Sequence, residues 1–192
     1  YYVDNFHVDL YMAGLLTATF IFPASLLRPL GGWLSDRWGA RRVMYWTFGL
    51  MLLSSGVLMM PNGFLTIVHP DGSETTHWHY AMNLPLFVTL VFLLGCAMGF
   101  GKAAVYKHIP EYFPDNVGSV GGLVGMLGGL GGFVLPPLFA YTKTWSGFPS
   151  STFFCVFVLV AICLVWMHLT IHRMLDKASP ELADKIDKEG DE

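Results

Sequence analysis

One arginine inside an apolar run is the side chain in this sequence best suited to chemistry. Arg28 lies in the segment Ser-Leu-Leu-Arg-Pro-Leu-Gly-Gly at residues 25–32. A charge at the centre of a bilayer costs at least ~2.5 kcal/mol, so such a residue usually has a function. The guanidinium fork donates two parallel hydrogen bonds and therefore suits planar oxyanions. Arg28 is interpreted as an anion ligand facing a central cavity, or as an interhelical ion pair or a side chain that reaches the membrane surface.

A second candidate is a run of eight glycines at residues 118–132. Seven of them recur at spacings of three or four residues, with 121/122 and 128/129 as adjacent pairs, and occupy roughly a third of a helix circumference, whereas Gly131 lies off that face. In a bilayer the helix forms despite its glycines, because the backbone must satisfy its own hydrogen bonds. The bare face is either a helix-packing face or a sliding, substrate-lining face, and spacing alone does not separate the two. The seven residues are Gly118, Gly121, Gly122, Gly125, Gly128, Gly129 and Gly132.

A short basic turn follows Arg28 and carries the third group of polar residues. Taken alone it is a topological anchor with a helix cap, in which Gly39 permits the turn and Asp36 caps the helix or pairs with Arg41 or Arg42. The residues of the turn are Gly32, Asp36, Arg37, Gly39, Arg41 and Arg42.

The elements that position these residues are long apolar runs. The chain has 192 residues, of which 54% are hydrophobic and 13% charged, and this combination indicates an all-α membrane protein. Pro23 and Pro29 predict a bend in the first span. Because the first residue is Tyr, we expect the chain to begin inside a longer protein. Within residues 1–173 the expected spans are about 8–34, 43–60, 84–106, 118–141 and 152–171, and residues 174–192 form a charged tail.

Lys and Arg near the ends of the spans predict the orientation. Eight lie on one side and only Lys143 on the other, so that side and the C-terminus are expected to be cytoplasmic in a plasma (inner) membrane. The eight are Arg37, Arg41, Arg42, Lys107, Arg173, Lys177, Lys185 and Lys188.

Other kinds of site are weakly supported. The three cysteines lie in apolar runs and read as small buried residues. His77 and His79 could bind a transition metal, but a loop hairpin is the favoured interpretation, so no metal or cofactor is expected. Basic patches for nucleic acid, Walker loops and nucleophile elbows are lacking, and an enzyme is not expected.

The basic turn resembles the G-x-x-x-D-R-x-G-x-R-R loop of the major facilitator superfamily, in which it lies on the cytoplasmic side and latches the inward-closed state. Residues 99–114 and the glycine run resemble the nitrate/nitrite porter family within that superfamily. The resemblance implies that the chain provides helices 8–12 of twelve, facing an absent N-terminal half. It also implies that Arg28 is the substrate arginine, completed by a second arginine from that half. The implied signature glycines are Gly121, Gly125, Gly128, Gly129 and Gly132.

Lys102 departs from the family pattern. Many members have Gly-x-Gly-Asn-Gly where this chain has Gly-Phe-Gly-Lys-Ala at residues 99–103. By spacing Lys102 shares a helix face with Gly95, Gly99 and Tyr106. Its ammonium group either reaches the membrane surface or alters anion affinity or coupling.

The resemblance implies transport of nitrate and nitrite by alternating access. Because Glu111 and Asp115 lie at a loop and no acid lies in the interior of a span, nitrate/nitrite antiport is favoured over nitrate/proton symport. A non-transporting membrane scaffold subunit, packed through the glycine face, is the alternative from another class. The expected partners are the two anions, the lipid bilayer and the absent half.

Overall fold

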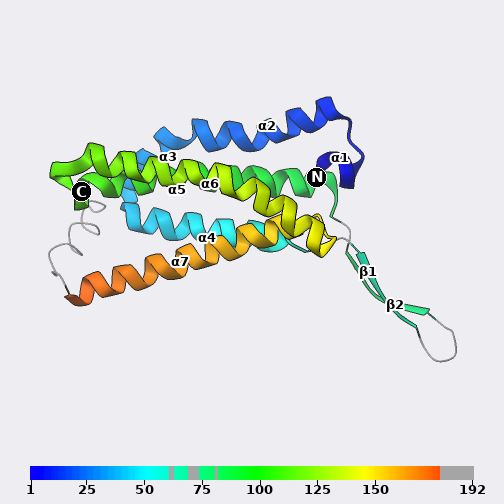
Figure 1. The fold of residues 1–192 in the computed structure, drawn as a ribbon. Helices are drawn as coiled ribbons and strands as arrows, with labels where there is room; N and C mark the ends of the chain where they lie inside the picture. The colour runs from blue at the N-terminus through cyan, green and yellow to red at the C-terminus, as the bar shows by residue number, and fades with distance from the viewer. Residues whose placement is uncertain (61–62, 69–73, 81, 178–192) are drawn as a thin grey trace.

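The computed structural model describes residues 1–60, 63–68, 74–80 and 82–177, with the side chains of Asp4, residues 63–81 and residues 174–177 excluded. Long helices lie roughly lengthwise beside one another, and one hairpin projects from one end (Figure 1). The helices are α1 (Tyr2–Phe6), α2 (Leu10–Leu26), α3 (Arg28–Trp38), α4 (Ala40–Leu58), α5 (Leu84–Tyr112), the short 3-10 helix η1 (Pro114–Asn116), α6 (Val117–Ser146) and α7 (Ser151–Lys177). The strands are β1 (Gly63–Val68) and β2 (Glu74–Tyr80).

The helical membrane fold expected from composition is confirmed. Among the described residues, three stretches are long and apolar enough to cross a bilayer, namely α5, η1 with α6, and residues Ser151–Arg173 of α7. The bent pair α2 and α3 makes a fourth if it is counted as one span. Helix α4 is not among these candidate spans. Its 19 residues cover most of the expected range 43–60, but its first turn contains Arg41 and Arg42. The five-span organisation therefore stays a prediction.

The predicted bend lies at Leu27, between α2 and α3. The two helices meet at 45°. The Leu27 N–H donates to the Pro23 carbonyl over 3.0 Å, and the Gly31 N–H donates to the Leu27 carbonyl over 2.9 Å. Pro29 has no N–H to continue the ladder through the first turn of α3. Arg28 therefore begins a new helix at the break.

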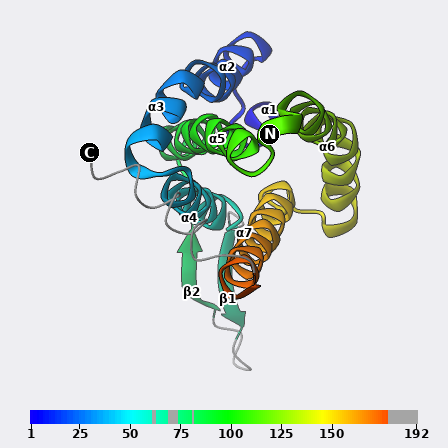
Figure 2. The same cartoon turned by 90° about the vertical axis from the view of Figure 1, so that its left-hand side faces the viewer.

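Helix α5 is the central helix of the bundle, with α2, α3 and α4 packed against it (Figure 2). Glycines make these contacts close. A Cβ on Gly95 would lie 2.5 Å from the carbonyl oxygen of Phe20, and one on Gly99 would lie 3.0 Å from that of Pro23. Gly31 of α3 meets the backbone of α5 in the same way, at 2.8 Å. Small residues thus let the backbones of α2, α3 and α5 touch.

A hydrophobic cluster at the hairpin end of the bundle ties α4, α5 and the N-terminus together. Leu58, Phe87 and Leu90 are buried within it. The Tyr1 ring stacks on the Phe87 ring at 4.7 Å between centroids, and Phe153 of α7 meets Phe87 edge-on at 5.6 Å. This cluster fixes the starts of α1, α5 and α7 at one end, opposite the basic turn.

The hairpin occupies the long loop between α4 and α5. Its two strands are antiparallel, pairing Gly63 with Tyr80 and Val68 with Glu74, with a register irregularity between Leu65 and Thr66. This agrees with the hairpin interpretation of the loop. The side chains of His77 and His79 lie outside the described part, so the metal hypothesis stays untested there.

Candidate functional site

Arg28 lies at the bend and points its charge away from the packed core. Its side chain is exposed, and within the described residues it has no hydrogen-bond or ion-pair partner. Among those residues, an ion pair with another helix of this chain therefore does not account for the charge of Arg28. A guanidinium without a protein partner, beside a break in a helix, can donate its fork to an anion or reach the membrane surface.

The glycine face of α6 is mostly unoccupied. A Cβ on Gly121 would lie 3.9 Å from Ile109 Cδ1, and one on Gly125 would lie 3.2 Å from the Tyr106 hydroxyl oxygen. At the other five positions nothing lies within 4 Å of an added Cβ among the described residues, namely Gly118, Gly122, Gly128, Gly129 and Gly132.

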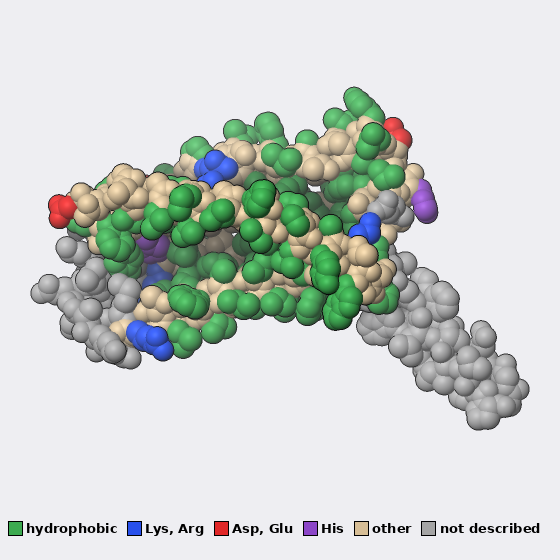
Figure 3. All heavy atoms as spheres, viewed as in Figure 1, with side chains coloured by type: hydrophobic (Ala, Val, Ile, Leu, Met, Phe, Trp, Pro, Cys, Tyr) green, Lys and Arg blue, Asp and Glu red, His purple; other side chains and the backbone are tan. Residues whose placement is uncertain are grey.

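Helix α6 has no buried residue along its described length. Phe133 is 78% exposed on it. Figure 3 shows hydrophobic side chains covering α6 and α7 on the face in view. A packing face within this chain thus accounts for two glycines of the seven, and the rest of the face is open.

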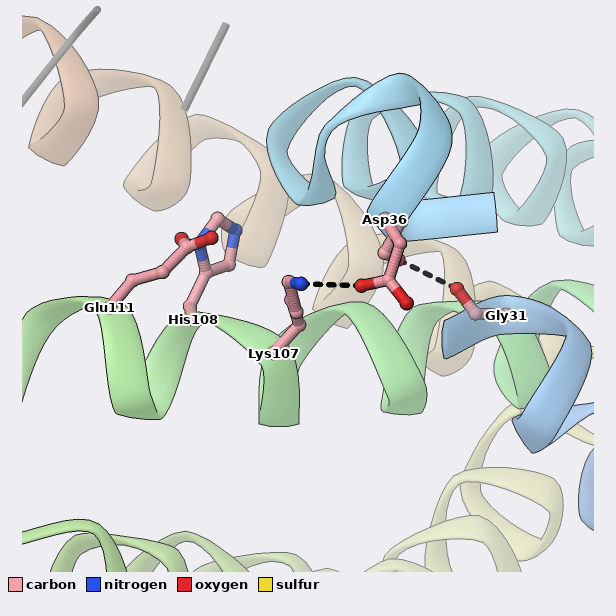
Figure 4. A network of polar contacts seen from close by, with 6 residues as sticks. Gly31, Asp36, Lys107, His108 and Glu111 are labelled. Atoms are coloured by element: carbon pink, nitrogen blue, oxygen red, sulfur yellow. Dashed lines mark hydrogen bonds and ion pairs between the residues drawn. The ribbon is translucent and has the colours of Figure 1, made fainter. Parts of the chain in front are cut away.

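The basic turn is built around Gly39, whose φ of 82° favours glycine. Asp36 forms an ion pair with Lys107 near the end of α5, as Figure 4 shows. The sequence had suggested Arg41 or Arg42 as the partner of Asp36, and the pair with Lys107 instead joins α3 to α5. Arg37 lies over the Trp33 ring, 5.7 Å from its centroid.

Gly31 and His108, which are adjacent to Gly32 and Lys107, extend the set of residues that form the turn and its contacts. In the part of the chain that the structure describes, nothing lies within 4 Å of a Cβ added to Gly32, and the adjacent Gly31 is the glycine held against α5. Next to Lys107, His108 Nδ1 lies 3.3 Å from a Glu111 carboxylate oxygen. The charged end of the molecule therefore includes the last turns of α5 (Figure 4).

Lys102 is exposed on α5 and has no partner among the described residues. The residues expected to share a helix face with Lys102 contact different helices. Gly95 and Gly99 meet α2, whereas Tyr106 meets Gly125 of α6. Lys102 thus lies on the part of α5 between two different contacts.

The sequence did not indicate the contacts that two residues of this region make. Lys107 pairs with Asp36 from 71 positions away. Tyr106 is the side chain of α5 that comes closest to the glycine face of α6. Nor do the described residues include a group of three or more His, Cys, Asp or Glu side chains placed to hold a metal.

Comparison with known proteins assigns the family. The sequence profile of the major facilitator superfamily matches residues 1–188. A probable nitrate/nitrite antiporter, NarK1 of Thermus thermophilus, is 59% identical over 191 residues, covering 100% of this chain and 43% of that protein. A probable nitrate transporter, NarT of Staphylococcus aureus, is 29% identical over 164 residues, covering 85% of this chain and 36% of that protein.

The chain thus spans about two fifths of the length of these curated relatives. No solved structure gives a significant match. The relatives are transporters, and the apolar helices place the chain in a membrane. The chain therefore belongs to the major facilitator superfamily.

Proposed function

We propose that this chain forms five membrane helices in the C-terminal half of a longer transporter that exchanges nitrate for nitrite by alternating access. The similarity to a probable nitrate/nitrite antiporter over the whole chain supports the substrate class. The observation that carries the proposal is the exposed guanidinium of Arg28 at the break between α2 and α3, without a partner among the described residues.

Arg28 binds the anion in this proposal. Nitrate and nitrite each present two oxygens in one plane, which match the two parallel N–H groups of a guanidinium. Arg28 is the first residue of α3, directly after the bend between α2 and α3. Transporter sites of this kind commonly use broken helices near the middle of the bilayer, at the interface of the two halves. A second arginine, from the absent half, completes the site.

Helix α6 provides the moving surface. Its open glycines present backbone with no side chain, and a facing helix of the other half can slide or rock along it. The signature glycines Gly121, Gly125, Gly128, Gly129 and Gly132 line the anion path in this proposal. Lys102 of α5 adds a cation beside that path.

The basic turn is proposed as the cytoplasmic latch. It holds Asp36 against Lys107 at the end of the bundle where most Lys and Arg residues gather. By the positive-inside rule that end and the C-terminus face the cytoplasm of a plasma (inner) membrane. The turn's other members are Gly32, Arg37, Gly39, Arg41 and Arg42.

The positions of the acids support exchange rather than proton symport. Asp9 precedes the first turn of α2, Asp36 lies near the end of α3, and Glu111 lies in the last turn of α5. Helices α4 and α6 contain no Asp or Glu. A proton relay commonly needs a carboxylate within the membrane, and these helices do not place one there.

Transport assays in liposomes test this proposal. The complete native protein is reconstituted with nitrite inside, and nitrate entry is followed with and without a pH gradient. Exchange requires internal nitrite and ignores the gradient, and Arg28→Lys abolishes it because the ammonium cannot form the bidentate pair. Arg173→Lys, which makes the same exchange at an exposed position near the end of α7, outside the proposed site and latch, is the matched control and retains exchange.

The other outcomes identify the alternatives. Uptake driven by the pH gradient without internal nitrite would make the protein a nitrate/proton symporter. Folded protein without nitrate flux under either condition would favour a scaffold subunit packed through the glycine face. Full exchange in Arg28→Lys would remove Arg28 from the site.

A further inference from the structure

A cavity of about 250 Å³ lies between the ends of α4, α5 and α7, away from Arg28 and the glycine face. Arg41 lines it from the first turn of α4, and Tyr112 lines it from the last turn of α5. Trp166, Met167 and Thr170 line it from α7. The walls combine one permanent cation, two hydroxyl groups and a larger apolar surface.

The cavity lies at the ends of candidate membrane-spanning helices, and at the end of a span a bilayer changes from acyl chains to headgroups. It is formed by the last turns of two candidate spans, Leu84–Tyr112 and Ser151–Arg173. Trp166 is 73% exposed, and tryptophan is enriched at the membrane interface. The cavity thus opens toward lipid at the basic end of the helices.

We propose that this cavity binds an anionic phospholipid, with its phosphate on Arg41 and the first part of an acyl chain against Trp166 and Met167. Arg41 is half-buried, so its guanidinium meets a phosphate in a partly dry setting where the attraction is strong. The hydroxyl groups of Tyr112 and Thr170 can donate to other phosphate oxygens. The site does not depend on which anion the protein transports.

A lipid fits this cavity better than a peptide segment does. The acidic residues after position 177 also complement Arg41 in charge. A peptide, however, would bring backbone N–H and C=O groups against mostly apolar walls, where unpaired polar groups are costly. A phospholipid has an anion at one end and hydrocarbon at the other, which matches the lining. His108 also lines the cavity, and its partner Glu111 is a nearby carboxylate that opposes an anion.

Native mass spectrometry of the full-length protein tests the site. The protein is titrated with phosphatidylglycerol or with phosphatidylcholine of the same acyl chains. One nearby arginine favours the anionic lipid by about fivefold, and we expect at least this preference. Arg41→Gln removes most of it, and Arg41→Lys, which keeps the charge, restores part of it. Arg42→Gln removes the same charge from the next residue, which is exposed and outside the lining, and leaves the preference intact.

A second variant tests the cavity without changing charge. Thr170→Trp fills the space and weakens binding of both lipids at this site, while folded, monodisperse protein is retained. An equal loss in Arg41→Gln and Arg42→Gln would overturn the proposal, since it would reflect general surface attraction. A preference that appears only after deletion of residues 178–192 would also overturn it, because the acidic segment would then be the occupant.

Discussion

The contact between Gly95 and Phe20 gives a prediction whose size follows from the structure. In Gly95→Ala, the new methyl group would lie 2.5 Å from the Phe20 carbonyl oxygen and 3.2 Å from its ring. The obstacle is the backbone of α2, so the two helices must separate by several tenths of an ångström. Overpacking of this kind costs about 1–3 kcal/mol.

Helix propensity acts in the opposite direction, because Ala is favoured over Gly in a helix by about 1 kcal/mol. Gly49→Ala is the matched control, since no atom of the described residues lies within 4 Å of its added methyl group on α4. The propensity gain is common to both variants and cancels in their difference. We therefore expect Gly95→Ala to be less stable than Gly49→Ala by about 1–3 kcal/mol.

Thermal unfolding of the full-length protein in detergent, followed by tryptophan fluorescence, measures this difference. Gly95→Ala should unfold several degrees below Gly49→Ala. Equal midpoints for the two variants would refute the reasoning, because α2 and α5 would then have room for a methyl group where the backbones are said to touch.

Two further predictions concern contacts that join α5 to its neighbours. Asp36→Asn and Lys107→Gln should show a coupling of about 0.2–1 kcal/mol in a double-mutant cycle of thermal stability, because the side chains are 59% and 30% exposed and water screens their attraction. The coupling should shrink in high salt, and a salt-independent value would contradict this account. Gly125→Ala places a methyl group 3.2 Å from the Tyr106 hydroxyl oxygen and should slow nitrate exchange, whereas Tyr106→Phe in the same protein should restore it. If the double variant is as slow as Gly125→Ala alone, the hydroxyl contact is not the cause.

The sequence predicted the helices better than it predicted the contacts between them. Apolar runs near 20 residues long located the helices, since a bilayer requires each segment to satisfy its own backbone. Pro23 and Pro29 predicted the bend that lies at Leu27. These features are local, so residues close in sequence determine them.

Contacts between helices were harder to predict. The density of glycines drew attention to α6, yet the tightest glycine contacts are those of Gly31 and Gly95 with α5 and α2. Periodicity identifies a face of a helix but not the helix that meets it. For the same reason the sequence offered Asp36 only a helix cap or the nearby Arg41 and Arg42, whereas its partner Lys107 comes from another helix.

Equilibrium binding of nitrate to the purified full-length protein tests the central claim, that Arg28 is the anion ligand, most directly. The unmodified protein should bind nitrate saturably. Arg28→Lys should weaken binding by about tenfold or more, because loss of a bidentate, charge-assisted pair costs about 1.5–3 kcal/mol. Arg173→Lys, at an exposed position near the end of α7, should bind as the unmodified protein does. Unchanged nitrate affinity in folded Arg28→Lys would contradict the account.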